Sequence, residues 1–224
     1  MIRRIFASGL LAGLAAGAVA ATLQAVTTTP LILHAEVFEA AHAAAHAAAG
    51  PAHAAADHAA GAASLTLGRL ALSSLATVIF GVGFALILVA LMALAGGPVD
   101  ARRGALWGLA GFAVASFAPA LGLPPELPGA AAADLTARQL WWLATVACTG
   151  TGLWLILRDG RAWAIGVAVV LIAAPQLWGA PHGEGAGTAP PELAARFAVL
   201  SLAVMALFWT LIGALGGAFY RRFA

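Results

Sequence analysis

The chain has 224 residues, of which 62% are hydrophobic and only 9% are charged. Soluble globular domains carry about 25% charged residues, so this composition excludes a soluble domain, gives no reason to expect a nucleic-acid partner, and indicates a protein of the lipid bilayer. The net charge is only +2, and every basic residue is an arginine. The single cysteine, Cys148, excludes a disulfide framework or a CxxC metal site, so a bound metal would need imidazole, carboxylate, carbonyl or water ligands.

Apolar segments of membrane-spanning length recur along the chain. A helix rises about 1.5 Å per residue and must cross about 30 Å of hydrocarbon, so about 20 apolar residues suffice. We therefore predict an all-α, polytopic transmembrane helix bundle with six spans, arranged as three helical hairpins in a single integral membrane domain over residues 1–224. The predicted spans are residues 5–28, 70–95, 105–123, 139–157, 162–180 and 197–219. The first segment has an alternative interpretation as a signal peptide, with Ala-Val-Ala at 18–20 as its cleavage site.

Arginine placement predicts the orientation of the spans. Eight arginines fall at the termini and in the second and fourth loops, whereas the other loops hold only Arg69, Arg138 and Arg196. By the positive-inside rule, both termini are expected to be cytoplasmic. The same assignment places all six histidines and most carboxylates outside.

Two spacing patterns concern helix packing. Gly9, Gly13 and Gly17 recur every four residues and would allow a neighbouring helix to approach closely, although Ala/Gly-rich composition alone could produce the same spacing. A weak internal repeat also appears: each outward helix carries a proline followed by a glutamate, and each returning helix begins at a lone arginine. Its members are Pro30, Glu36 and Arg69; Pro119, Glu126 and Arg138; and Pro175, Glu184 and Arg196. The repeat favours tandem hairpins, but prolines and glutamates are also common at outer helix ends.

The segment 33–63 holds five of the six histidines, and residues 40–63 contain 16 alanines and four histidines. We expect residues 34–63 to form an extracytoplasmic loop, and if the preceding helix continues into it, Glu39, His42 and His46 share one face. Imidazole and carboxylate ligands suit Co²⁺, Ni²⁺ or Zn²⁺, and imidazole, with an ordinary pKa of about 6.5, releases metal as the pH falls. The candidate capture ligands are Glu39, His42, His46, His53, Asp57 and His58, and the candidate contacts at the outer mouth are Glu36, Glu126, His182 and Glu184. The alternative is an Ala/His tract that serves as a disordered tether.

The predicted spans contain no carboxylate or arginine at mid-depth, where a proton-coupled pump keeps a relay residue. No GxxxxGK[ST] phosphate-binding loop occurs either. We therefore expect no catalytic residues, no tightly bound cofactor and no enzyme activity; the metal would be cargo.

Four segments resemble the CbtA family of predicted cobalt transporter subunits: PLILHAEVFE at 30–39, FAPALGLPPELPGAAAADLTARQLWWLAT at 117–145, APQLWGAP at 174–181 and FWTLIGALGGAFYRR at 208–222. The resemblance implies a multi-pass protein of a bacterial inner membrane that takes up cobalt for cobalamin synthesis. It also implies a small one-span partner with its own His-rich end, the CbtB protein. We therefore expect the membrane subunit of a divalent metal uptake system, most consistent with cobalt. The alternative is a non-transporting metal-sensing or assembly partner in the membrane.

Overall fold

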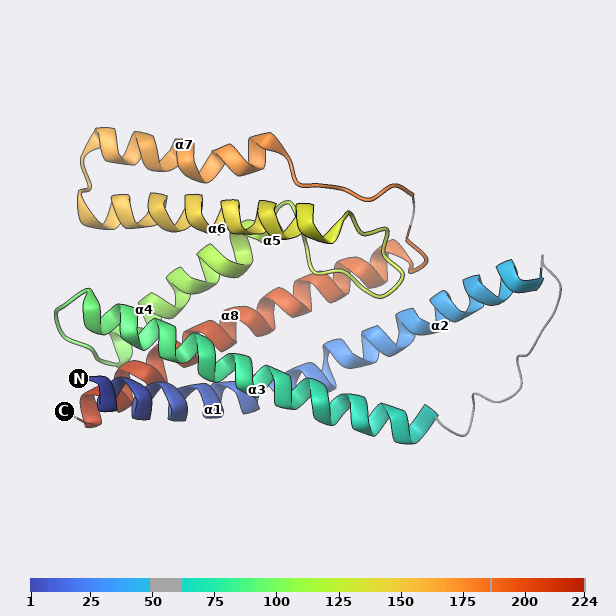
Figure 1. Cartoon of the computed structure of the whole chain (residues 1–224), viewed down its shortest axis with the longest axis horizontal. Helices are drawn as coiled ribbons and strands as arrows, with labels where there is room; N and C mark the ends of the chain where they lie inside the picture. The colour runs from blue at the N-terminus through green and yellow to red at the C-terminus, as the bar shows by residue number, and fades with distance from the viewer. Residues whose placement is uncertain (49–61, 186, 224) are drawn as a thin grey trace.

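The computed structural model describes residues 1–48, 62–185 and 187–223, and all regular secondary structure in these ranges is helical. This confirms the predicted all-α class. The helices run back and forth along one axis, and the two termini lie at the same end (Figure 1). The elements are α1 (Ile2–Val26), α2 (Thr28–Ala48), α3 (Ala62–Leu94), α4 (Ala101–Phe112), the π-helix η1 (Ala113–Phe117), α5 (Ala118–Ala120), α6 (Leu135–Arg158), α7 (Ala162–Trp178) and α8 (Pro191–Arg222).

Within the described residues, four helices are long and apolar enough to cross a membrane. They are α1, α3 from Leu67, α6 and α8, and they correspond to the first, second, fourth and sixth predicted spans. The predicted fifth span is α7, an apolar helix of 17 residues. The predicted third span is divided among α4, η1 and α5, which follow one another without a break. The structure thus supports several membrane-spanning helices, and the count of six stays a prediction.

The first helix continues well beyond the predicted span, with an interruption at Thr27. Thr27 Oγ1 donates to Leu23 O at 2.5 Å and Thr28 Oγ1 donates to Gln24 O at 3.2 Å. Threonines that bond back to a carbonyl four residues earlier bend helices, and Pro30 removes one more backbone donor. Beyond this bend α2 runs to Ala48, so the first part of the expected loop is helical.

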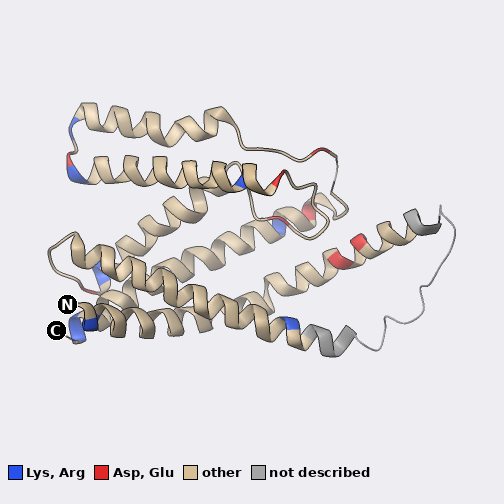
Figure 2. Cartoon of the chain, in the orientation of Figure 1, with Lys and Arg blue, Asp and Glu red and all other residues tan. Residues whose placement is uncertain are grey.

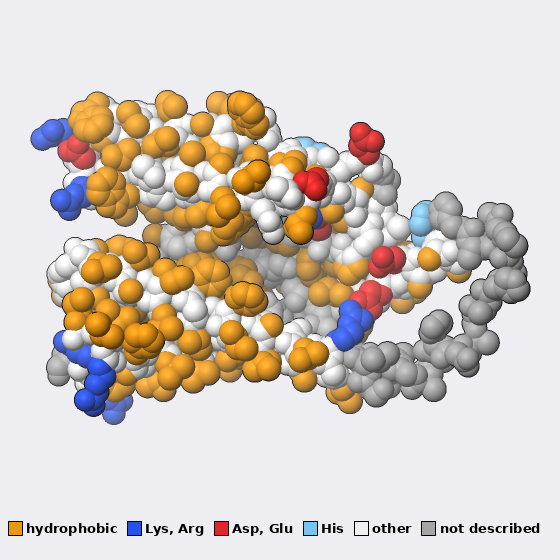
Figure 3. Space-filling view, in the orientation of Figure 1, with side chains coloured by type: hydrophobic (Ala, Val, Ile, Leu, Met, Phe, Trp, Pro, Cys, Tyr) orange, Lys and Arg blue, Asp and Glu red, His pale blue; other side chains and the backbone are white. Residues whose placement is uncertain are grey.

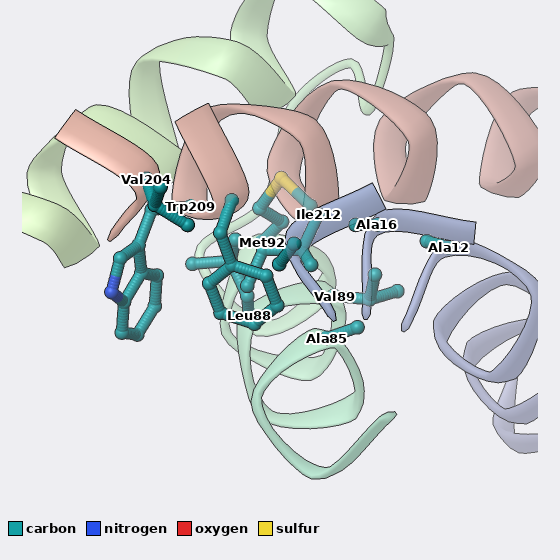
Figure 4. Packing of buried hydrophobic residues seen from close by; sticks show 11 residues of the cluster. Ala12, Ala16, Ala85, Leu88, Val89, Met92, Val204, Trp209 and Ile212 are labelled. Atoms are coloured by element: carbon teal, nitrogen blue, oxygen red, sulfur yellow. The ribbon is translucent and has the colours of Figure 1, made fainter. Parts of the chain in front are cut away.

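The main core lies where α1, α3 and α8 meet. Its buried side chains include Ala12, Ala16, Val89, Met92 and Ile212, which Figure 4 shows converging from the three helices. Because alanine side chains are small, the three helices can pack very close together here.

Glycines set the two closest helix contacts. A Cβ added to Gly13 would lie 2.3 Å from Val82 Cα, so α1 and α3 touch backbone to backbone. A Cβ on Gly104 of α4 would lie 2.1 Å from Gly213 O of α8. The glycine spacing in the first span therefore has the packing role that one of its two interpretations predicts.

The α6–α7 hairpin packs against the rest of the bundle through η1 and α5. Trp141 Nε1 of α6 donates to Pro175 O at 3.2 Å, and Pro175 lies inside α7. Gln176 Nε2 of α7 donates to Ala118 O at 2.9 Å, at the junction of η1 and α5. Both bonds satisfy polar groups inside an apolar layer. The first joins the two helices of the hairpin, and the second fixes the hairpin to the third passage of the chain.

Candidate functional site at the acidic end

The two ends of the bundle carry opposite kinds of side chain. Figure 2 shows arginines at the end where both termini lie, and most carboxylates at the other end. We call these the arginine end and the acidic end. The arginine end holds Arg3, Arg4, Arg102, Arg103, Arg158, Arg161, Arg221 and Arg222, and the acidic end holds Glu36, Glu39, Glu126, Asp134, Glu184 and Glu192.

The layer between the two ends is almost wholly apolar on its surface. Large side chains such as Phe80, Ile79, Val170 and Trp154 are more than half exposed, and Figure 3 shows hydrophobic side chains covering the middle of the molecule. A water-facing surface would not leave so much apolar area uncovered, so this layer fits the hydrocarbon of a bilayer. Histidine side chains in Figure 3 lie with the carboxylates at the acidic end.

Helix α2 carries the first predicted ligands away from the apolar layer. Glu39 and His42 are exposed and lie three residues apart on α2, as the helical interpretation of this segment requires. His46 lies on the same helix, but its side chain is outside the described residues, as are His53, Asp57 and His58. The structure therefore describes two of the six predicted capture ligands in full.

Two of the predicted mouth residues form ion pairs with arginines of the returning helices. The Glu36 carboxylate accepts two bonds from Arg69, at 2.5 and 3.2 Å, and joins α2 to α3. Glu126 Oε2 lies 2.9 Å from Arg138 Nη2, at the start of α6. These are the first two Glu/Arg pairs of the sequence repeat. The part of the chain that the structure describes contains no ion pair between Glu184 and Arg196, the third pair of the repeat.

These carboxylates can still bind a metal cation although each is paired with an arginine. The Arg69 side chain is 60% exposed, and an exposed ion pair contributes only about 0–1 kcal/mol. A divalent cation with a second ligand nearby could therefore replace the guanidinium at small cost.

A small hydrophobic cluster holds the acidic end together. Leu31 and Ala35 of α2 pack with Leu127 of the loop before α6 and with Phe197 of α8. Leu127 lies next to Glu126, and Leu31 and Ala35 lie on the same helix as Glu36 and Glu39. The cluster therefore fixes the position of three of the predicted acidic residues.

Glu39 lies where three segments meet. A Cβ on Gly129 would lie 3.7 Å from Glu39 Cβ and only 2.1 Å from Thr188 Oγ1. Thr188 N donates to Gly129 O at 3.0 Å, which joins the loop before α6 to the loop before α8. The Thr188 Oγ1 atom is buried and has no hydrogen-bond partner among the described residues. No sequence pattern indicates Thr188, because it is a lone threonine in a Gly/Pro-rich loop.

His182 and Glu184 occupy the loop between α7 and α8, and both are exposed. Gly183 between them packs against the neighbouring loop, since a Cβ there would lie 2.1 Å from Ala131 O. This contact holds the exposed pair at the surface of the acidic end.

Among the described side chains, no group of three or more histidines, cysteines or carboxylates is close enough to hold one metal ion. The described arrangement is a distributed set of carboxylate and imidazole side chains at one end of the bundle. Such a set can attract and exchange a divalent cation, because weak, separate ligands release an ion readily.

Comparison with known proteins identifies a family. The sequence model of a family described as "Probable cobalt transporter subunit (CbtA)" matches residues 2–221, nearly the whole chain. No curated protein and no solved structure matches the chain.

Proposed function

The chain belongs to the CbtA family of probable cobalt transporter subunits, and from that premise we propose that it is the multi-pass subunit of a cobalt uptake system in a bacterial inner membrane. Residues 34–63 capture the ion on the outer side. The observation that carries the proposal is the separation of charge along the bundle, with arginines at one end and carboxylates and histidines at the other (Figures 2 and 3). Both termini share the arginine end, which the positive-inside rule assigns to the cytoplasm.

In this proposal the ion moves from the capture segment to the mouth of the bundle. The ligands of the capture segment are Glu39, His42, His46, His53, Asp57 and His58. The mouth ligands are Glu36, Glu126, His182 and Glu184. Glu39 supports this order, because its neighbours Gly129 and Thr188 belong to the two loops that carry the mouth ligands.

The family description calls these proteins subunits, which implies a partner in the transport system. We propose that the partner is a small one-span membrane protein with a His-rich end, like CbtB. No described residue in the middle of the spans can act as a proton relay. If transport is coupled to protons, the partner would supply that relay.

Uptake into liposomes tests the transport proposal. Liposomes that carry the full chain, with and without the small partner, are incubated with labelled Co²⁺, and retained label is compared with that in empty vesicles. Accumulation above empty vesicles supports transport. No accumulation in either preparation removes the transport proposal.

The alternative function, a non-transporting metal-sensing or assembly partner, is favoured by one observation: the predicted ligands whose side chains the structure describes lie outside the apolar layer rather than within it. Deletion of residues 40–63 separates the two functions. A transporter keeps its maximal uptake at high Co²⁺ with a higher apparent KM, whereas a sensor loses its response at every concentration.

A further inference from the structure

Four arginines gather at one corner of the arginine end, where α1 begins and α8 ends. They are Arg3, Arg4, Arg221 and Arg222. Residues 1–35 and 193–223 contain no aspartate or glutamate, and none of the four arginines forms an ion pair with a described carboxylate. The other corners differ: Arg161 pairs with Asp159 at 3.3 Å, and Asp100 accepts a bond from the backbone of Arg103.

The Arg4 guanidinium is held in a fixed position. It lies over the Tyr220 ring, with 4.5 Å between Arg4 Cζ and the ring centroid, and its Nη2 donates to Tyr220 O at 3.1 Å. Its Nε is buried and has no hydrogen-bond partner among the described residues. A buried guanidinium N–H without an acceptor is costly, so this atom requires an oxygen that the described chain does not supply.

A cavity of about 550 Å³ lies beside this guanidinium. It is lined by Met1, Arg3, Arg4, Ala7 and Phe223, and its volume falls within the range of about 300–1,000 Å³ that is typical of ligand sites. Its wall combines two guanidinium groups with apolar side chains. That combination suits a molecule with an anionic head and an apolar body.

We propose that this cavity binds the phosphate group of an anionic phospholipid in the leaflet at the arginine end. Arg3 and Arg4 hold the phosphate oxygens, since guanidinium geometry matches phosphate and Nε of Arg4 still needs an acceptor. Phe223 and Ala7 contact the apolar part of the lipid. The lipid would tie the first helix to the last one at their common end.

The alternative for this cluster is the general excess of arginine on cytoplasmic surfaces, which requires no specific ligand. Two features go beyond that excess: the orphan Nε donor on a fixed guanidinium, and the cavity beside it. Free inorganic phosphate could satisfy the same donor but would leave the apolar wall unused.

Native mass spectrometry of the full chain in detergent tests the proposal. The measured quantity is the fraction of protein that retains one phospholipid after addition of phosphatidylglycerol or phosphatidylcholine. We expect clear preference for phosphatidylglycerol. One arginine near an anionic lipid surface contributes about a fivefold factor in binding. Arg3→Gln should therefore lower the retention of phosphatidylglycerol about fivefold, and Arg3→Gln with Arg4→Gln should lower it further.

The matched control is Arg158→Gln with Arg161→Gln, which removes the same charge from another corner of the same end and should leave retention unchanged. Arg3 is exposed, so Arg3→Gln carries the test even if the double variant fails to fold. Equal retention of the two lipids, an equal loss in the control variant, or displacement of the lipid by inorganic phosphate at the same concentration would each overturn the proposal.

Discussion

Gly13 offers the sharpest test of how this bundle is held together. In Gly13→Ala the new Cβ would lie 2.3 Å from Val82 Cα and 2.6 Å from Val82 N, and backbone cannot move aside as a flexible side chain can. Helices α1 and α3 would have to separate by about 1 Å to reach the 3.4 Å of ordinary contact.

The expected cost follows from two opposing effects. Overpacking of a tight interface costs about 1–3 kcal/mol, and a backbone clash belongs at the upper end of that range. Replacing glycine by alanine in a helix returns about 1 kcal/mol. We therefore expect a net loss of about 2 kcal/mol, or a fall in Tm of about 4–8 °C for a chain of this size.

Thermal unfolding in detergent, followed by circular dichroism, measures this fall. Gly83→Ala is the matched control, because it lies on α3 and a Cβ there meets nothing within 4 Å. The control should be neutral or slightly stabilising. If both variants melt at the temperature of the unmodified protein, the close α1–α3 contact does not exist as described.

Three further predictions concern the acidic end and the hairpin. Because Arg69 competes with a cation for Glu36, Arg69→Gln should lower the apparent KM for Co²⁺ uptake and Glu36→Gln should raise it. In each variant Tm should change by less than the equivalent of about 1 kcal/mol. A KM shift in the same direction in both variants would exclude the competition. Trp141→Phe removes the indole donor to Pro175 O and should cost about 0.5–1.5 kcal/mol plus any cavity effect, measured by the same thermal unfolding, and an unchanged Tm would contradict this bond. Co²⁺ bound by the full chain in equilibrium dialysis should fall on acidification, since a protonated imidazole cannot bind a metal ion, whereas pH-independent binding would contradict histidine ligands.

The sequence predicted the helices well and their interruptions poorly. Long apolar runs bounded by arginine locate the helices, because hydrocarbon requires both length and internally bonded backbone. High alanine content correctly predicts that α2 can continue past the apolar layer to Ala48. The π-helix at Ala113–Phe117 has no comparable signal in the sequence. The bend at Thr27 is local, because it follows from threonine side chains that bond to carbonyls four residues earlier and from Pro30.

The candidate site shows a similar division. Glu36, Arg69, Glu126 and Arg138 stand out in the sequence as part of a repeat. Only the packed structure shows that these two Glu/Arg pairs of the repeat are ion pairs, one between α2 and α3 and one between the loop before α6 and α6 itself. The meeting of Glu39 with Gly129 joins residues far apart in the chain, and spacing cannot reveal such a contact. The predicted metal ligands remain predictions, because their roles depend on an ion that binds to several segments together.

The π-helix has a consequence for how the third passage is shared between its neighbours. One extra residue in a helical turn shifts the phase of everything beyond it by about 100°. Before η1, Gly104 and Gly108 face α8, whereas after it Ala118 O accepts from Gln176 of the hairpin and Gly122 lies against Trp141. In a regular α-helix of the same sequence, the residues beyond Phe117 would point about 100° away from their present direction relative to α4. The π-helix therefore lets the start of the third passage pack against α8 while its end packs against the α6–α7 hairpin.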